Sequence, residues 1–271
     1  MILKDKKVAV IGAGPVGLTI AKLLQQKGAE VTVYERDKDP EARIWGGTLD
    51  LHRQSGQVAL AAAGLLDEYY ARAIPMGVIM ADEQGRVLTV KNLKPEQELD
   101  NPEISRNELR KLLLNSLNAA TVVWDHQCTG LEEQDGQWLM HFDHQPTATA
   151  DLIIGANGGM SAVRSFVADT VIEETGTFII QGDVPEPEIN CAEFYQKCDG
   201  HRWMAAFGGN LIVVNPLNAG RLSYGVIFEK PAYWKGMDFS NTSRVTAFLT
   251  ERFSEWDDSY HQLFRSTAFF V

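Results

Sequence analysis

The stretch VAVIGAGPVGLTIAKLLQQKGAEVTVYERD, residues 8–37, constrains the fold of this chain more than any other. It begins with a short apolar run rich in β-branched residues, which is typical of a buried parallel strand. A GxGxxG turn follows, and then LTIAKLLQQKG, which has helical composition and a stop at Gly28. A second run, AEVTVYE, ends on Glu35. This order of strand, glycine turn, helix and strand predicts the first unit of a dinucleotide-binding α/β domain.

Each glycine of the turn has a physical role in holding a dinucleotide. Gly12 permits the tight turn, Gly14 lets a pyrophosphate approach the backbone, and Gly17 lets the helix pack close to the strand. The helix N-terminus presents free amides to the anion. Glu35 stands where an acid accepts hydrogen bonds from an adenosine ribose, and its charge disfavours a 2′-phosphate. We therefore expect FAD or NAD rather than NADP as the resident nucleotide; the alternative is an ordinary glycine-rich turn.

Composition and charge argue against several classes of protein. The formal net charge of -11 disfavours nucleic-acid binding, because phosphate contacts rely on clustered Lys and Arg. The apolar runs near the N-terminus are too short to span a membrane, and no secretory signal precedes the first motif, so we expect a cytoplasmic protein. Cys128, Cys191 and Cys198 form no CxxC pair and are expected to be thiols in a reducing compartment, buried or incidental rather than metal ligands.

The pattern after this motif departs from that of a simple dehydrogenase. A helical stretch over 55–73 is followed by two strands around a DEQG turn over 75–90, and then by a helix over 104–117. TVVWD and QWLMHF are expected to be strands. Residues 150–167, ADLIIGANGGMSAVRSFV, give a third apolar strand with a glycine-rich turn. From Glu173 onward, short alternating runs predict an antiparallel sheet.

Four segments together resemble a known family. GAGPVGL, GGTLDLH, SRNELR and DLIIGANGGMSAVR resemble the group A flavoprotein monooxygenases, and within them the Tet(X)-like, tetracycline-inactivating branch, over nearly the whole chain. The resemblance implies an α/β fold, in which a Rossmann-like FAD-binding domain of the GR2 type, as in p-hydroxybenzoate hydroxylase-like enzymes, is interleaved with an antiparallel β-sheet substrate domain. The implied FAD-binding domain is 1–65 with 96–171, and the implied substrate domain is 66–95 with 172–271.

The resemblance also implies an activity. FAD would be resident, NADPH would bind transiently to reduce it, and O₂ would then form a flavin C4a-hydroperoxide that hydroxylates and inactivates a tetracycline. The alternatives are a related aromatic or polyketide hydroxylase of the same fold and a non-catalytic FAD-binding fragment. The family's third FAD segment and long C-terminal helix do not follow STAFFV in this sequence. We therefore expect a segment supplied separately, or weak FAD retention and poor solubility without it.

Cofactor residues are carried over by matching position. Gly12 and Gly14 would line the pyrophosphate, with Gly17 completing the cofactor-binding turn. Glu35 and Arg36 would hold the adenosine half, Asp50 and Arg106 would contact FAD, and Arg43 would guide NADPH. A fixed cation near a helix start, such as Arg106, can pair with a pyrophosphate. The alternatives are surface salt bridges for Arg36 and Arg43, and a charge that supports the helix for Arg106.

Substrate residues follow from the same resemblance. Gln181 and Arg202 occupy positions that contact the polar edge of the tetracycline, where an amide and a guanidinium suit keto and enol oxygens. The alternative is that both are strand residues facing water. Two positions of the drug pocket differ, because Val213 replaces an aromatic residue and Ser223 replaces a histidine. A related polyketide or phenolic substrate therefore stays open.

Overall fold

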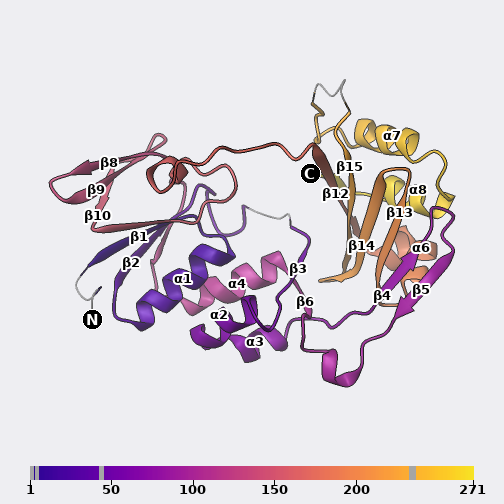
Figure 1. Ribbon diagram of the computed structural model, residues 1–271, viewed down its shortest axis with the longest axis horizontal. Coiled ribbons are helices and arrows are strands. Elements are labelled where there is room, and N and C mark those ends of the chain that lie inside the picture. The colour runs from indigo at the N-terminus through magenta and orange to yellow at the C-terminus, as the bar shows by residue number, and fades with distance from the viewer. Residues whose placement is uncertain (1–2, 4–5, 43–45, 232–235) are drawn as a thin grey trace. The chain divides into compact units, whose positions relative to one another are not determined.

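The computed structural model describes residues 3, 6–42, 46–231 and 236–271, and the chain divides into two compact units (Figure 1). Unit 1 consists of Met1–Gly46, Arg53–Arg72 and Arg106–Ile172. Unit 2 consists of Gly47–His52, Ala73–Ser105 and Glu173–Val271. Each unit is thus assembled from three separate segments of the chain.

Two segments expected in the FAD-binding domain, 47–52 and 96–105, lie in unit 2 instead. The reason is strand pairing: β3 (Thr48–Asp50) and β6 (Glu103–Ser105) form a two-stranded antiparallel sheet. The side chain of Asn215, from the large sheet of unit 2, also donates a 2.7 Å hydrogen bond to the Thr48 hydroxyl. Tertiary contacts of this kind leave no local sequence pattern.

Residues 66–72 were expected in the substrate domain and lie in unit 1. The expected helix over 55–73 is in fact two helices, α2 (Gly56–Ala63) and α3 (Leu66–Tyr70). Gly64 separates them, because its φ of 74° is left-handed and ends α2. Tyr69 of α3 is fully buried, which anchors this short helix in unit 1.

Unit 1 is built on a parallel sheet in the order β11-β1-β2-β7. Its strands are β1 (Lys7–Ile11), β2 (Glu30–Tyr34), β7 (Val122–Val123) and β11 (Leu152–Gly155). Helix α1 (Pro15–Gln26) packs against β1 and β2, and α2 and α4 (Arg106–Ser116) pack on α1 (Figure 1). The predicted strand, turn, helix and strand are confirmed, and the predicted third strand lies beside the first.

The second face of this parallel sheet is covered by a small antiparallel sheet. Its strands are β8 (Cys128–Gln134), β9 (Gln137–Phe142) and β10 (Ala148–Ala150). Ala9 and Ile11 of β1 share a core with Met140 and Phe142 of β9. Because side chains alternate along a strand, Val8 and Val10 point to the helical side. A 3₁₀ turn, η2 (Arg164–Phe166), follows β11.

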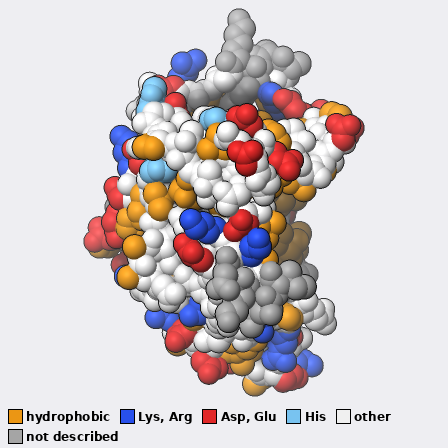
Figure 2. Space-filling model, turned by 90° about the vertical axis from the view of Figure 1, so that its left-hand side faces the viewer, with side chains coloured by type: hydrophobic (Ala, Val, Ile, Leu, Met, Phe, Trp, Pro, Cys, Tyr) orange, Lys and Arg blue, Asp and Glu red, His pale blue; other side chains and the backbone are white. Residues whose placement is uncertain are grey.

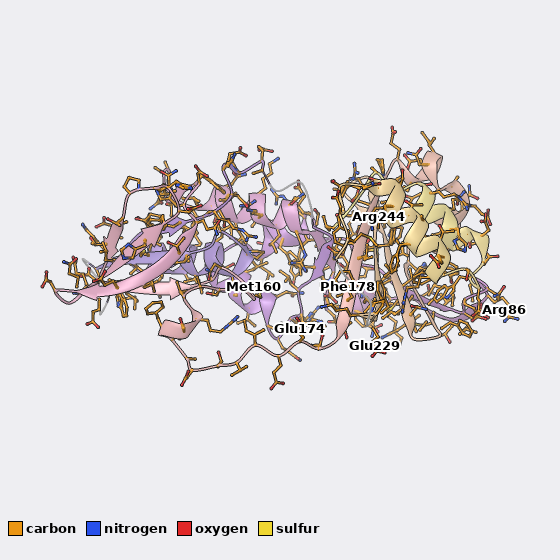
Figure 3. The ribbon with its side chains drawn as sticks, turned by 90° about the horizontal axis from the view of Figure 1, so that it is seen from above. Arg86, Met160, Glu174, Phe178, Glu229 and Arg244 are labelled. Carbon is orange, nitrogen blue, oxygen red and sulfur yellow. The ribbon has the colours of Figure 1, made fainter. Side chains whose placement is uncertain are left out.

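Unit 2 is built on a seven-stranded sheet in the order β16-β12-β15-β14-β13-β4-β5. The strands are β4 (Val78–Ala81), β5 (Val87–Lys91), β12 (Thr177–Pro185), β13 (Arg202–Phe207), β14 (Asn210–Asn218), β15 (Arg221–Glu229) and β16 (Phe269–Phe270). All neighbours are antiparallel except β13 and β4, which are parallel. The predicted antiparallel sheet is therefore confirmed, and the predicted DEQG hairpin, with Arg86 at its tip, extends one edge (Figure 3).

Helices cover one face of the large sheet. They are α5 (Pro187–Asn190), α6 (Ala192–Cys198), α7 (Thr242–Arg252) and α8 (Asp258–Arg265), and η1 (Pro95–Gln97) lies in the loop before β6. The core beneath them contains alternate strand residues such as Ile180, Trp203 and Val226 together with Phe194 and Phe264 of the helices. The opposite face is called the open face below, and it carries the residues of odd number on β12 and β15.

The buried thiols give a first testable prediction. Cys128, Cys191 and Cys198 are all buried, and burial raises the pKa of Cys191 to about 11 and that of Cys198 to about 12. Because only the thiolate reacts, we expect almost no reaction of the folded protein with a disulfide reagent near about pH 8. Unfolding in urea should release all three thiols. Fast labelling of Cys191 or Cys198 without denaturant would contradict their place in the core.

Both signs of charge occur together on one face of the molecule. Figure 2 shows acidic and basic side chains interspersed on the face that it displays. Among the residues that the structure describes, no helix is long and apolar enough to cross a bilayer.

Candidate functional site

The glycine turn between β1 and α1 is shaped by close backbone approaches. Gly12 has φ of 107°, and a Cβ there would lie 2.7 Å from the carbonyl oxygen of Ala156. A Cβ on Gly17 would overlap the carbonyl oxygen of Gly12. A Cβ on Gly14, in contrast, would meet nothing within 4 Å. The packing of the protein itself thus requires positions 12 and 17 to lack a side chain, whereas the space at Gly14 is open to a ligand.

Glu35 ties the end of β2 to this turn. Its side chain is 4% exposed, and its carboxylate accepts hydrogen bonds from the Ala13 amide at 2.5 Å and from the Asp37 amide at 3.0 Å. Each carboxylate oxygen can accept more than one hydrogen bond, and ligand hydroxyls are suitable donors. Arg36 follows directly and is exposed. The expected placement of Glu35 beside the glycine turn is therefore what the structure shows.

A pocket of about 520 Å³ lies over these elements, within unit 1. Its wall is formed by the glycine turn, Glu35, Arg36, the segment 126–128 and the second glycine motif, 156–160. The two glycine motifs meet because the amide of Ala156 donates a 2.8 Å hydrogen bond to Ile11 at the end of β1. The exposed Met160 projects from the second motif (Figure 3). An open turn at a helix start with a buried acid beside it fits a dinucleotide.

Arg110 was not predicted as a site residue, although it lies inside the quoted motif SRNELR. Its Nε donates to the Ala13 carbonyl at 3.2 Å, and its Nη2 lies 2.8 Å from Asp37 Oδ2. The guanidinium is buried and lies over the Trp124 ring, 5.3 Å from its centroid. Arg110 therefore holds the turn through the carbonyl of Ala13, the residue whose amide donates to Glu35. Its position one helical turn after Arg106 was the available signal.

Arg106 is the first residue of α4. Its side chain packs against Gly46, and partial burial lowers the pKa of its guanidinium from the ordinary value. Arg43 lies outside the described residues. Asp50, the other expected FAD contact, belongs to β3 in unit 2.

Unit 2 presents a second set of polar groups on its open face. Gln181 and Ser223 lie near Gly47, since a Cβ on that glycine would be 3.9 Å from each side-chain polar atom. Val213 is partly buried and pairs with Gly225, which in turn pairs with Gln181. Gln181, Val213 and Ser223, all singled out from the sequence, therefore come together on one face of one sheet.

Arg202 is on the same face, and its charge is paired. Its guanidinium forms an ion pair with Glu103, which is 5% exposed, and its Nη2 lies 3.9 Å from Asp50 Oδ2. Asp50 also lies 3.8 Å from His52 Nε2. Glu103 was missed in the sequence because nothing local marks an acid that is buried by a strand a hundred residues away.

A second ion pair on the open face was also missed. Arg221 of β15 pairs with Asp183 of β12 and lies over the Phe269 ring. Burial raises the pKa of the Asp183 carboxyl, and the hydrogen bond from Arg221 acts in the opposite direction.

In the part of the chain that the structure describes, no group of three or more His, Cys, Asp or Glu side chains could hold a metal ion.

Comparison with known proteins places this geometry in context. A family model described as "FAD binding domain" matches residues 5–236. The 3-amino-4-hydroxybenzoate 2-monooxygenase of Streptomyces cremeus is 31% identical over 191 residues, which cover 68% of this chain and 48% of that protein. The chain spans about half the length of the curated relatives it matches.

Solved structures show the same fold. Klebsiella pneumoniae HpxO, solved with FAD and uric acid, superposes with a TM-score of 0.79 at 24% identity, covering 97% of this chain and 66% of that one. The tetracycline destructase Tet(51) superposes with a TM-score of 0.70 at 18% identity, covering 98% and 68%.

Proposed function

The chain belongs to the FAD-binding domain family, and from this premise we propose that it is an FAD-dependent monooxygenase that uses NADPH to insert one oxygen atom into a ring compound. FAD, when bound, supplies the chemistry, since it accepts electrons from a nicotinamide and activates O₂. The observation that carries the proposal is the open space at Gly14 beside the buried carboxylate of Glu35. The curated relative named above is itself a monooxygenase.

The chain's own residues have distinct tasks in this proposal. The backbone at Gly12 and Gly14 holds the pyrophosphate at the start of α1, and Glu35 accepts the ribose hydroxyls. Arg36 contacts the adenosine half, and the cation of Arg106 balances phosphate charge. Asp50 contacts FAD, and Arg43 guides NADPH. The open face of the large sheet orients the substrate, and its apolar residues keep water from the reacting atoms.

Tetracycline is the first substrate to test. Two solved tetracycline destructases share the fold, and Gln181 lies on the open face with Ser223 as its neighbour. Inactivation of the drug by hydroxylation would then be the reaction. Val213 and Ser223 favour the second candidate, a related aromatic or polyketide hydroxylase, as does the relative named for an aminohydroxybenzoate. A third candidate is a non-catalytic FAD-binding fragment, because the chain spans about half of its relatives.

One preparation separates these candidates. The purified chain is loaded with FAD, and NADPH oxidation in air is followed with and without tetracycline, together with the absorbance of the drug. Drug-dependent NADPH consumption with loss of drug absorbance supports the first candidate. Consumption that responds only to phenols supports the second. A flavin-loaded chain that never oxidises NADPH supports the third, and the same assay on a longer chain then tests whether a further segment is needed.

A substitution at Glu35 tests the cofactor site. Glu35→Gln places an amide N–H against a backbone N–H, so we expect the dissociation constant of FAD to rise about tenfold. The quenching of flavin fluorescence by the apoprotein measures it. Glu30→Gln, an exposed change at the start of β2, the strand that ends just before Glu35, is the matched control. Equal FAD affinity of the Glu35 variant and the control would exclude Glu35 from the cofactor site.

A further inference from the structure

Both arginines on the central strands of the open face are neutralised within unit 2. Arg202 on β13 pairs with Glu103, and Arg221 on β15 pairs with Asp183. Glu103 and Asp183 are 5% and 9% exposed, so water does little to screen these pairs. Neither guanidinium is therefore available as an unpaired cation for an anionic ligand.

The environment of Arg202 makes this clearest. Asp50 and Glu103 lie directly opposite each other in the antiparallel pair of β3 and β6. Like charges at such a position repel and destabilise a sheet. The guanidinium of Arg202 meets both carboxylates, with its Nη2 3.9 Å from Asp50. One cation between two carboxylates leaves the local charge negative.

Among the described residues, the other polar groups at the centre of the face are uncharged. They are the amides of Gln181 and Asn215 and the hydroxyl of Ser223. Lys91 pairs with Val78, which in turn pairs with Arg202, so the three residues form one row across the sheet. Lys91 lies on the exposed edge strand β5, where water screens its charge. Amides and hydroxyls recognise carbonyl, hydroxyl and amide groups by hydrogen bonds.

We propose that the open face selects a ring substrate that bears no carboxylate, and that Glu103 is the residue that determines this selectivity. The inference rests on the proposed function, in which this face binds the substrate. A carboxylate brought here would lose its hydration and meet the negative charge of Asp50 and Glu103, and no described residue at the centre of the face offers it a free cation in return. A neutral ring with a carbonyl or amide edge loses less hydration free energy than a carboxylate does. It also gains hydrogen bonds from Gln181 and Ser223.

A matched pair of probes tests the proposal. The FAD-loaded chain is dialysed to equilibrium against 4-hydroxybenzamide or 4-hydroxybenzoate, which differ only in the charge of one group. We expect the amide to bind more tightly by about tenfold, the size of one poorly placed charge. Glu103→Gln keeps the shape of the side chain and frees Arg202, so the preference should disappear or reverse in favour of the carboxylate. Glu251→Gln, an exposed change on α7 across the sheet, should leave it unaltered.

Each other outcome overturns the inference. These outcomes are equal or tighter binding of the carboxylate by the unaltered chain, no binding of either probe, and an unchanged preference in the Glu103 variant. If that variant does not fold, Asp183→Asn, which frees Arg221, should shift the preference in the same direction. NADPH oxidation, measured in parallel with tetracycline, reports on the proposed function separately, because a chain can oxidise NADPH and still prefer carboxylates.

Discussion

Gly17→Ala is expected to abolish FAD retention. The added Cβ would overlap the carbonyl oxygen of Gly12, which is backbone and cannot rotate away. Either α1 moves off β1 or the turn opens, and both changes displace the amides that hold the pyrophosphate. Overpacking of this kind costs about 3 kcal/mol. We expect a lower midpoint in urea and a colourless protein after gel filtration.

Gly14→Ala is the informative partner of this change. Its Cβ would meet no protein atom within 4 Å, and its φ of -77° suits alanine. The variant should therefore unfold at the same urea concentration as the unaltered chain. Its methyl group nevertheless occupies the space through which a pyrophosphate would approach, so FAD affinity should fall by about a hundredfold. Flavin retention by the Gly14 variant, at normal stability, would show that the cofactor does not bind over this turn.

The glycine turn was predictable because its signal is local. Backbone requirements at Gly12 and Gly17 and the acid at Glu35 all fall within one strand, turn, helix and strand unit, where spacing fixes geometry. The strands of unit 2 were predictable for the same reason, since alternation of apolar residues marks each one. Gln181 and Ser223 could be placed together once those strands were expected to pair.

The ion pairs of the open face were not predictable. Arg202 and Glu103 are about a hundred residues apart, and neither strand carries a pattern that names its partner. Arg202 was expected to contact substrate, and its ion pair with Glu103 could not be foreseen beside that role. The unit boundaries near 47–52 and 96–105 were missed for a related reason, because β3 and β6 are short strands whose pairing is tertiary.

The pairing of Arg202 with Glu103 has the second large expected effect, on stability. Arg202→Met removes the partner of a buried carboxylate, and an uncompensated charge at such a site costs on the order of 3 kcal/mol. Arg244→Met, an exposed change on α7 (Figure 3), should cost little. Urea unfolding followed by tryptophan fluorescence gives both values.

The double variant distinguishes an ion pair from simple packing. Glu103→Gln in the Arg202→Met background removes the stranded charge, so the double variant should be more stable than Arg202→Met alone. If Arg202 contributed only packing through its aliphatic stem, the two losses would add and the double variant would be the least stable of the set. A positive coupling free energy also supports the selectivity argued above, because it shows that the guanidinium is committed to Glu103 and not held free for an anionic substrate.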